Sequence, residues 1–335
     1  MSAASVHLSP QAALYGDAAP LPALPPCVHY AGSEKFLAKA LALQAERGPV
    51  FDVSGDCEDG APVGLEIPHA KMVAKLIASP ANRFGRMGAR IHDVTHPSWT
   101  TDLEILVGDA GDRLAFLTLP KAERAADVLR MADTLATETA RAGLARQIPI
   151  SVLIETPGAA HDAWAIAAVP GVVSLDFGTL DFVSAHQGAI PLSAMESPGQ
   201  FDHALLRRAK ADVAAAALAH GVVPAHGVTR ALDDPAIAGG DAARARNEFG
   251  YLRMWSIHPS QIEPIVRAMQ PSTAEIDEAA RVTLAAYEAD WAPLRVDGKL
   301  HDRASYRYCW SVLTRAHAAG VALPASTAPF FTSGS

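Results

Sequence analysis

The chain has few cysteines, and none of them are close together in sequence. Cys27, Cys57 and Cys309 are its three cysteines, and no Cys-x-x-Cys motif occurs. Closely spaced cysteines are typical of zinc sites, and a dense, even set is typical of small secreted domains held by disulfides. The cysteine content therefore indicates neither kind of site, and it predicts a protein of a reducing compartment such as the cytoplasm.

Long hydrophobic runs are also missing. No apolar stretch approaches the roughly 20 residues that a helix needs to cross a bilayer. The first residues lack the basic start and continuous apolar core of a signal peptide, and residues 1–26 are instead rich in alanine and proline. We therefore expect no export signal and no membrane partner, and we expect residues 1–26 to form an N-terminal arm rather than a packed element.

Positive charge is scarce as well. Lys and Arg number 28 against 36 Asp and Glu, which gives a formal net charge of −8 at pH 7. Proteins that bind nucleic acids normally carry a basic surface that displaces counterions from the phosphates. No basic stripe occurs in this sequence, so we expect no nucleic-acid partner.

Two common catalytic motifs are absent. No G-x-G-x-x-G follows the first predicted strand, which weakens the case for a doubly wound dinucleotide-binding sheet. No G-x-S-x-G occurs either, so a hydrolase with a Ser-His-Asp triad is poorly supported.

The chain does contain a regular alternation of short apolar runs and helical patterns. Strands are predicted at residues 27–31, 50–55, 87–91, 114–119, 148–154, 172–177, 222–225 and 252–257. The clearest helical patterns between them cover residues 34–46, 121–142, 204–220 and 240–249. Eight strands with intervening helices predict an α/β fold, a (β/α)₈ TIM barrel over residues 27–271, with a doubly wound sheet as the alternative.

Residues 272–321 fall outside the eight β/α units. They predict a helix, a short Val-Asp-Gly turn and a second helix over residues 302–319. We expect this segment to form a C-terminal appendage, followed by a flexible tail over residues 322–335.

Residues 148–182 carry the pattern most indicative of chemistry. Two neighbouring predicted strands each end in a carboxylate beside turn residues, Glu155 in Ile-Glu-Thr-Pro-Gly and Asp181 in Gly-Thr-Leu-Asp. One β/α unit separates the two acids, which places them at the catalytic end of an α/β barrel. Such a pair can hold one Mg²⁺ that keeps positions free for substrate. Either acid alone would favour a helix cap or the start of a loop.

Three acids follow the second predicted strand, at Asp56, Glu58 and Asp59. Carboxylates this close repel one another unless they face a cation or accept hydrogen bonds, and an exposed acidic loop is the alternative. Arg90 lies between apolar residues of the third strand, and a guanidinium cannot deprotonate, so it must find an anion. We expect Arg90 to clamp a substrate carboxylate, to form a buried salt bridge with the acids, or both.

Three further strand-end residues each allow more than one interpretation. Lys121 could form a Schiff base, but beside a metal site a substrate contact or a helix start is favoured. His258 precedes a proline at the start of a helix whose N-terminus could receive an anionic group, or it could cap and pack. His226, at the end of the seventh strand, is similar.

Together these motifs resemble the citrate lyase β-subunit-like proteins of the HpcH/HpaI aldolase superfamily, which are related to malyl-CoA and citramalyl-CoA lyases. The resemblance covers about residues 27–270, with motifs at Asp56-Cys-Glu-Asp-Gly60, Arg90, Leu-Pro-Lys121, Ile154-Glu155-Thr, Phe177-Gly-Thr-Leu-Asp181 and Ile257-His-Pro-Ser-Gln261.

The resemblance implies a TIM barrel with Mg²⁺ held by Glu155 and Asp181. It implies that Arg90 binds the substrate carboxylate and that backbone amides around Gly178 and Thr179 hold the 2-oxo acid. Lys121, Ile257 and His258 would also contact substrate. Asp56, Glu58 and Asp59 would organise the waters of the metal.

The same resemblance assigns residues outside this group. Gly32, Lys35 and Lys39 resemble the family's loop for the phosphates and ribose of CoA. The segment Gly298-Lys-Leu-His-Asp302 resembles one that supplies an aspartate from the appendage to the active site of a neighbouring subunit. Asp302 is therefore the expected general acid/base, and a symmetric homo-oligomer, a trimer or hexamer, is the expected assembly.

The sequence departs from the family pattern where the CoA arm would lie. The arginine before the first strand is absent, and Cys27-Val-His29-Tyr30 stands there instead. The usual Val-Pro-Gly is Tyr30-Ala-Gly32 in a loop one residue shorter, and the usual Asp-Gly-Val is His226-Gly-Val. The helix after the acidic cluster lacks the usual run of Lys and Arg.

The expected function is that of a Mg²⁺-dependent carbon–carbon lyase. Its substrate would be a 3-hydroxy-dicarboxylyl-CoA such as malyl-CoA or citramalyl-CoA, cleaved into an acyl-CoA and a 2-oxo acid. The departures favour somewhat a CoA-independent aldolase that releases pyruvate or oxaloacetate from a free hydroxy-oxo acid. A non-catalytic ligand-binding or regulatory homologue is the third alternative.

Overall fold

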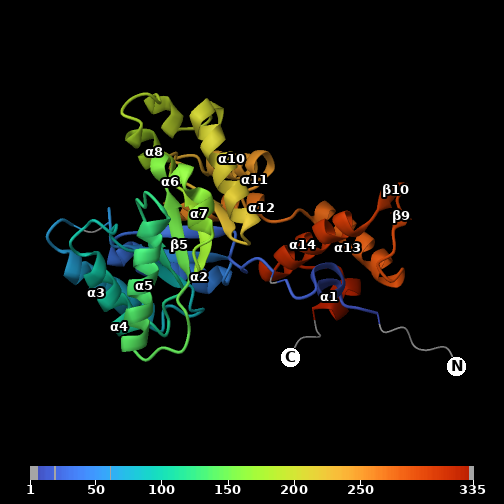
Figure 1. Cartoon of the computed structure of the whole chain (residues 1–335), viewed down its shortest axis with the longest axis horizontal. Coiled ribbons are helices and arrows are strands. Elements are labelled where there is room, and N and C mark those ends of the chain that lie inside the picture. Colours follow the sequence, from blue (N-terminus) through green and yellow to red (C-terminus); the bar gives the residue numbers. More distant parts are fainter. Residues whose placement is uncertain (1–6, 19, 61, 332–335) are drawn as a thin grey trace. The chain divides into compact units, whose positions relative to one another are not determined.

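The computed structural model describes residues 7–18, 20–60 and 62–331. The outer ends of the expected arm and tail, residues 1–6 and 332–335, lie outside these described ranges. The chain divides into two compact units (Figure 1). The larger unit is Leu24–Met269, and the smaller unit combines the two ends of the chain, up to Ala23 and from Gln270.

Eight parallel strands close into a barrel in the larger unit. They are β1 (Cys27–Ala31), β2 (Phe51–Asp56), β3 (Met87–Arg90), β4 (Leu117–Leu119), β5 (Ile150–Ile154), β6 (Val172–Phe177), β7 (Val223–His226) and β8 (Arg253–Ser256). Cys27 is in register with Phe51 of β2 and with Met254 of β8, so the sheet has no free edge. The predicted (β/α)₈ barrel is confirmed, and the doubly wound alternative is wrong.

Helices follow the strands around the barrel. They are α2 (Glu34–Arg47), α3 (Glu66–Ala78), α4 (Trp99–Ala110), α5 (Ala125–Arg141), α6 (Pro157–His161), α7 (Ala163–Ala167), α8 (Thr179–Ala185), η1 (Leu192–Met195), α9 (Gly199–Asp202), α10 (Ala204–Ala219), α11 (Pro235–Phe249) and α12 (Pro259–Met269). Their apolar faces and the outward-facing strand residues form the main core. No helix within the described ranges is both long enough and apolar enough to cross a membrane.

Two helices differ from the sequence prediction for local reasons. The helix predicted from residue 121 begins at Ala125, because the Asp127 carboxylate accepts the amides of Glu123 and Arg124 and caps the helix there. The alanine-rich helix predicted after Glu155 is two short helices that meet at Asp162, whose carboxylate accepts the Ala125 amide at 2.6 Å.

The barrel interior is partly polar. Val28, Tyr30, Phe116, Leu153, Ala225 and Trp255 form its apolar core. Near the starts of their strands, Arg253 and Asp52 form a buried ion pair. Asp176 is also buried and accepts the Trp255 Nε1–H at 2.7 Å. The ion pair and the hydrogen bond offset part of the cost of burying these groups, and Arg253 Nε has no hydrogen-bond partner among the described residues.

The smaller unit is built from α1 (Pro10–Tyr15), α13 (Thr273–Glu288), the hairpin β9 (Leu294–Val296) and β10 (Lys299–His301), α14 (Arg303–Ala318) and η2 (Ala325–Phe330). The predicted helix–turn–helix pattern is present, with a hairpin inserted at the turn. Asp297 and Gly298 have φ values of 49° and 78°, which suit the tight turn of a two-residue hairpin.

The described parts of the arm and tail are packed, which differs from our expectation. Leu14 of α1 is 1% exposed in the core of the smaller unit, and the Tyr15 hydroxyl lies 3.0 Å from Ser311 Oγ of α14. The Phe331 ring stacks on Trp310 at 5.1 Å. Proline and alanine content predicted an unpacked arm, but one apolar turn of helix is enough to dock on α14.

We predict that Leu14→Ala lowers the free energy of unfolding of the smaller unit by about 2–5 kcal/mol, because it leaves a cavity in a closed core. Leu8→Ala is the matched control, since Leu8 is 56% exposed and its loss should cost less than about 0.5 kcal/mol. Urea titration with hydrogen exchange of the α14 amides measures both. Equal protection in the two variants would show that the arm does not contribute to folding.

Candidate functional site

A cavity of about 260 Å³ opens at the carboxyl ends of the barrel strands. Residues at the end of every strand except β4 line it, including Tyr30, Arg90, Glu155, Asp181 and Trp255. Because active sites of α/β barrels lie at this end, the cavity is the candidate site.

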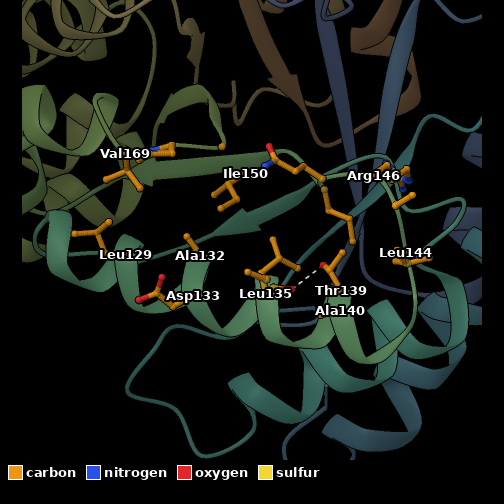
Figure 2. A pocket seen from close by; sticks show the side chains of 16 residues that line it. Leu129, Ala132, Asp133, Leu135, Thr139, Ala140, Leu144, Arg146, Ile150 and Val169 are labelled. Carbon is orange, nitrogen blue, oxygen red and sulfur yellow. Dashed lines mark hydrogen bonds between the residues drawn. The ribbon is translucent and has the colours of Figure 1, made fainter.

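A larger groove of about 440 Å³ lies between α5 and the segments that lead into β5 and β6 (Figure 2). Its lining is mostly apolar, with Asp133 and Arg146 as its charged residues. Arg146 donates hydrogen bonds to the carbonyls of Gly111 and Leu114, which is a structural role. The groove gathers no set of reactive groups, so the smaller cavity is where chemistry is concentrated.

Arg90 and the acids after β2 form one buried network. Arg90 Nε and Nη2 donate to the two carboxylate oxygens of Asp56 at 2.8 and 2.7 Å. Its Nη1 lies 2.7 Å from Glu58, and Nη2 lies 3.3 Å from Asp59. The predicted salt bridge is therefore present, and each of the three guanidinium nitrogens faces a carboxylate. A substrate carboxylate has to add to this network or displace one of its acids.

Lys121 belongs to the same network through an unusual backbone conformation. Its φ is +50°, a left-handed value that costs a residue with a side chain about 1–3 kcal/mol. In this conformation its amide donates to Glu155 Oε1 at 2.7 Å, and its Nζ lies 2.5 Å from Glu58 and 3.7 Å from Asp59. The conformation thus positions Glu155 and neutralises part of the acidic cluster.

The ammonium group of Lys121 does not suit Schiff-base chemistry. Burial acts to lower its pKa, but the hydrogen bond to Glu58 and the charges of Glu58, Asp59 and Asp181 act in the opposite direction, and the net shift of the pKa is upward. A Schiff-base lysine needs a depressed pKa. Of the two alternatives left by the sequence, the helix start is wrong, because α5 begins at Ala125, and the substrate contact stays a prediction.

Glu155 and Asp181 line the cavity as an uncompensated pair. Glu155 is 2% exposed, and burial, followed by the charge of Asp181, raises its pKa to about 8. Within the described residues Glu155 Oε2 accepts no hydrogen bond, and the Asp181 carboxylate has neither a hydrogen bond nor an ion pair. Two oxygen donors with surplus negative charge fit a hard divalent cation such as Mg²⁺.

Backbone space at Gly178 makes this arrangement possible. A Cβ on Gly178 would lie 2.5 Å from Glu155 Oε2 and 2.6 Å from its Cβ, so a larger residue would displace the carboxylate. In the part of the chain that the structure describes, no three His, Cys, Asp or Glu side chains converge on one metal position. The pair is therefore what the barrel itself offers to a metal.

Of the remaining residues predicted to contact substrate, only some lie at the cavity. Gly178, Thr179 and Ile257 line the cavity, and the buried Thr179 hydroxyl has no hydrogen-bond partner in the described ranges. His258 is exposed and lies 2.7 Å from Ser260 Oγ, as in the capping alternative. His226 is buried against Phe201, with ring centroids 5.1 Å apart, and burial holds its pKa well below the ordinary value.

The residues expected to bind CoA are divided between the cavity and the surface. Gly32 lines the cavity and lies against Gly60. A Cβ added to Gly32 would be only 2.8 Å from Gly60 Cα, so this close contact requires glycine. Lys35 and Lys39 are exposed on the first two turns of α2, one helical turn apart. The two lysines do not line the cavity, so any CoA contact with them would lie at its outer rim.

Asp302 lies in the smaller unit, at the N-terminus of α14. Its Oδ1 accepts the Ala304 amide at 3.0 Å, and its own amide donates to Ser305 Oγ at 3.0 Å. Its side chain is an N-cap in this chain. A second, catalytic role in a neighbouring copy stays a prediction.

Sequence reasoning gave no role to three residues that shape the site. Tyr30 and Trp255 line the cavity, and Gln261 joins the loops after β7 and β8. Gln261 Oε1 accepts the amides of Ile257 and His258, while its Nε2 donates to the carbonyls of Thr229 and Ala231. Its position next to a strand end was visible in the sequence, but its partners 30 residues away were not.

A closed parallel barrel with buried carboxylates and an arginine at its carboxyl end defines the class of (β/α)₈ barrel enzymes. The model of one family, HpcH/HpaI aldolase/citrate lyase, matches residues 69–259, which is more than half of the chain. The chain belongs to this family. Relatives named for lyase activity match the chain, which is accordingly an enzyme of the carbon–carbon lyase class.

Three similar proteins illustrate the relationship. The crystal structure of a citrate lyase from Burkholderia xenovorans LB400 is 51% identical, covers 97% of this chain and 100% of its own, and has a TM-score of 0.87. The L-malyl-CoA/beta-methylmalyl-CoA lyase of Rhodobacter capsulatus is 28% identical over 248 residues, 70% of this chain and 77% of the relative. CitE from Mycobacterium tuberculosis, solved with magnesium, acetoacetate and coenzyme A, shares the fold at 24% identity, with a TM-score of 0.68 over 89% of this chain and 100% of its own.

We predict that Asp56→Asn destabilises the protein by about 3–5 kcal/mol, because it removes the bidentate partner of a buried guanidinium. Asp59→Asn is the matched control: it contacts the same Arg90, but its side chain is 60% exposed, so it should cost less than about 1 kcal/mol. Chemical denaturation of both variants measures the difference. Similar losses in the two would show that Arg90 does not depend on Asp56.

Proposed function

We propose that the protein is a Mg²⁺-dependent carbon–carbon lyase that cleaves a 3-hydroxy-dicarboxylyl-CoA, such as malyl-CoA or citramalyl-CoA, into an acyl-CoA and a 2-oxo acid. The observation that carries this proposal is the uncompensated pair Glu155 and Asp181 in a cavity beside a buried arginine. The Rhodobacter capsulatus relative, named for malyl-CoA, and the magnesium, acetoacetate and coenzyme A of the Mycobacterium tuberculosis structure support the same reading.

Glu155 and Asp181 are the residues that would hold Mg²⁺. The ion, when bound, supplies a Lewis acid for the substrate oxygen that becomes the carbonyl of the 2-oxo acid. Lys121 keeps Glu155 in place through its amide, and Asp56 and Glu58 keep Lys121 and Arg90 in place. Asp59, which also lines the cavity, is free enough to orient water there.

Arg90, Gly178 and Thr179 would orient the acid half of the substrate. The guanidinium contributes a fixed positive charge next to the cavity, and the backbone around Gly178 lies close to Glu155. Ile257, which lines the cavity, and Lys121 and His258, which do not, are the further side chains that we assign to substrate contacts. A carboxylate held in this way keeps its neighbouring hydroxyl directed at the carboxylate pair.

Bond cleavage requires one proton to pass from the substrate hydroxyl to the water that Asp59 would orient, and one proton to arrive at the acyl half. The bond that breaks joins the carbinol carbon to the carbon next to the thioester, and its electron pair passes to that second carbon. We assign the protonation of this carbon to Asp302 of a neighbouring copy, beside the β9–β10 hairpin, which would make a trimer or hexamer the active form. In the reverse direction the same carboxylate removes the proton.

A second candidate is an aldolase that acts on a free hydroxy-oxo acid without CoA. The observation in its favour is that Lys35 and Lys39 do not line the cavity. Both candidates share the metal pair and differ in whether a thioester arm is bound outside it.

Calorimetry of the Mg²⁺-loaded protein with acetyl-CoA and, separately, glyoxylate tests the proposal. We expect both to bind, with acetyl-CoA weakened about tenfold in a Lys35→Ala, Lys39→Ala double variant, since two phosphate contacts are lost. Glyoxylate binding should be lost in Glu155→Gln and kept in Glu104→Gln, an exposed control. Binding of glyoxylate alone would favour the CoA-independent aldolase, and binding of neither, with no turnover of malyl-CoA, would contradict both candidates.

For Asp302→Asn we predict loss of malyl-CoA turnover by about 100-fold or more, in line with removal of a general acid. Folding should be unaffected, because Asn caps a helix as well as Asp does. Mg²⁺ affinity and acetyl-CoA affinity should also be unchanged. Normal turnover in this variant would remove the assignment of Asp302.

A further inference from the structure

Tyr30 presents a hydroxyl group that the described protein does not satisfy. The side chain lines the candidate cavity and is 7% exposed, and its hydroxyl oxygen has no hydrogen-bond partner among the described residues. A buried hydroxyl without a partner costs about 1–3 kcal/mol and is rare in native proteins. Tyr30 borders a binding cavity, but the oxygen itself is buried, so a ligand there supplies the missing partner after a small local shift of the cavity wall.

The other donors around the cavity are already occupied. Each guanidinium nitrogen of Arg90 faces a carboxylate, and Trp255 Nε1 donates to Asp176 at 2.7 Å. Among the cavity-lining side chains in the described ranges, the hydroxyls of Tyr30 and Thr179 are the donors that remain unpaired. Thr179 was already expected to face the substrate, whereas Tyr30 was not.

The surroundings make Tyr30 a donor rather than a base. Burial raises the pKa of the phenol well above its ordinary value; the charge of Arg90 acts to lower it, but those of Asp56, Asp176 and Glu155 raise it further. The hydroxyl therefore keeps its proton at neutral pH. A protonated phenol next to a cavity that would receive acids can donate to an anionic oxygen.

The ring of Tyr30 is held in a fixed position. It stacks on Trp255 with ring centroids 3.7 Å apart, and the Arg90 guanidinium carbon lies 5.1 Å from its centroid. Trp255 is itself fixed by its hydrogen bond to the buried Asp176. A donor held in this way needs little reordering on binding, which is the condition for a selective contact.

We propose that the Tyr30 hydroxyl is a substrate-binding group that donates a hydrogen bond to an oxygen of the acid half of the substrate, the part released as a 2-oxo acid. The assignment rests on the proposed function, because it requires a small acid beside the Glu155–Asp181 pair. It supplies a hydrogen-bond donor to the substrate, whereas the donors of Arg90 are already engaged by three acids. It also makes Tyr30 a specificity determinant, since an analogue without that oxygen leaves the hydroxyl unpaired.

Tyr30→Phe tests the assignment, because it removes one oxygen and keeps the stack on Trp255. We expect the Kd of the Mg²⁺-loaded protein for glyoxylate to rise about tenfold, the effect of one hydrogen bond of about 1.4 kcal/mol. Acetyl-CoA affinity and the midpoint of thermal unfolding should stay the same. In turnover, KM should rise with little change in kcat, as for a contact made equally in ground and transition states.

Ser54→Ala is the matched control. Ser54 is in register with Tyr30 on the neighbouring strand, and its hydroxyl is likewise buried without a partner, but it does not line the cavity. Its loss should leave glyoxylate binding within twofold of the wild type. An equal loss in both variants would overturn the assignment, because it would show a general disturbance of the barrel interior.

The outcomes separate this assignment from the proposed function. If the wild-type protein binds glyoxylate and the Kd of Tyr30→Phe is within twofold of the wild-type value, the role of Tyr30 is overturned and the lyase proposal stays intact. A Tyr30→Phe variant that loses acetyl-CoA instead of glyoxylate overturns the acid-half assignment. Wild-type protein that binds no oxo acid contradicts the proposed function, and the role of Tyr30 falls with it.

Discussion

The candidate site depends on one buried charge. Arg90 cannot lose its proton, so a barrel that encloses it has to enclose anions as well. These anions are Asp56, Glu58 and Asp59, at the end of β2 and in the loop after it. Together they contact all three nitrogens of the guanidinium. An acidic loop that would otherwise repel itself is ordered by this contact.

The same charge reaches the metal pair through a chain of contacts. Glu58, held by Arg90, binds the Lys121 ammonium, and the Lys121 backbone in its left-handed conformation donates to Glu155. The backbone strain at Lys121 is thus offset by two charge-assisted contacts. The five carboxylates of the site outnumber its two cations, and the surplus falls on Glu155 and Asp181, which have no cationic partner in the described ranges. Surplus negative charge at that point is the physical reason to place a divalent ion there.

Much of the fold and part of this site could be predicted from the sequence, because both follow local rules. Short apolar runs at regular spacing indicate buried parallel strands, and two acids at corresponding strand ends must meet on one rim of a closed barrel. The conformation of Lys121 and the packing of α1 on α14 could not be predicted in this way. A positive φ at a lysine has no sequence signal, and the docking of residues 10–15 depends on an apolar surface some 300 residues later in the chain.

The role of Tyr30 shows a similar limit. Its strand was predicted correctly, but strand alternation alone cannot tell which face of a barrel strand points inward when both faces are apolar. The inward orientation follows from contacts with Trp255, which lies on the strand that closes the barrel against β1.

Polar groups on the barrel floor and the binding cavity are connected through these aromatic rings. Asp176 fixes Trp255, Trp255 fixes Tyr30, and Tyr30 packs beneath the Arg90 guanidinium. Preorganisation of Tyr30 therefore comes from inside the barrel, whereas Arg90 is held by acids of the loop after β2. The group proposed to move the proton, Asp302, belongs to the other unit of the chain. Under the proposed function, binding would be a property of a single barrel, and turnover would require an assembly that brings a second chain to it.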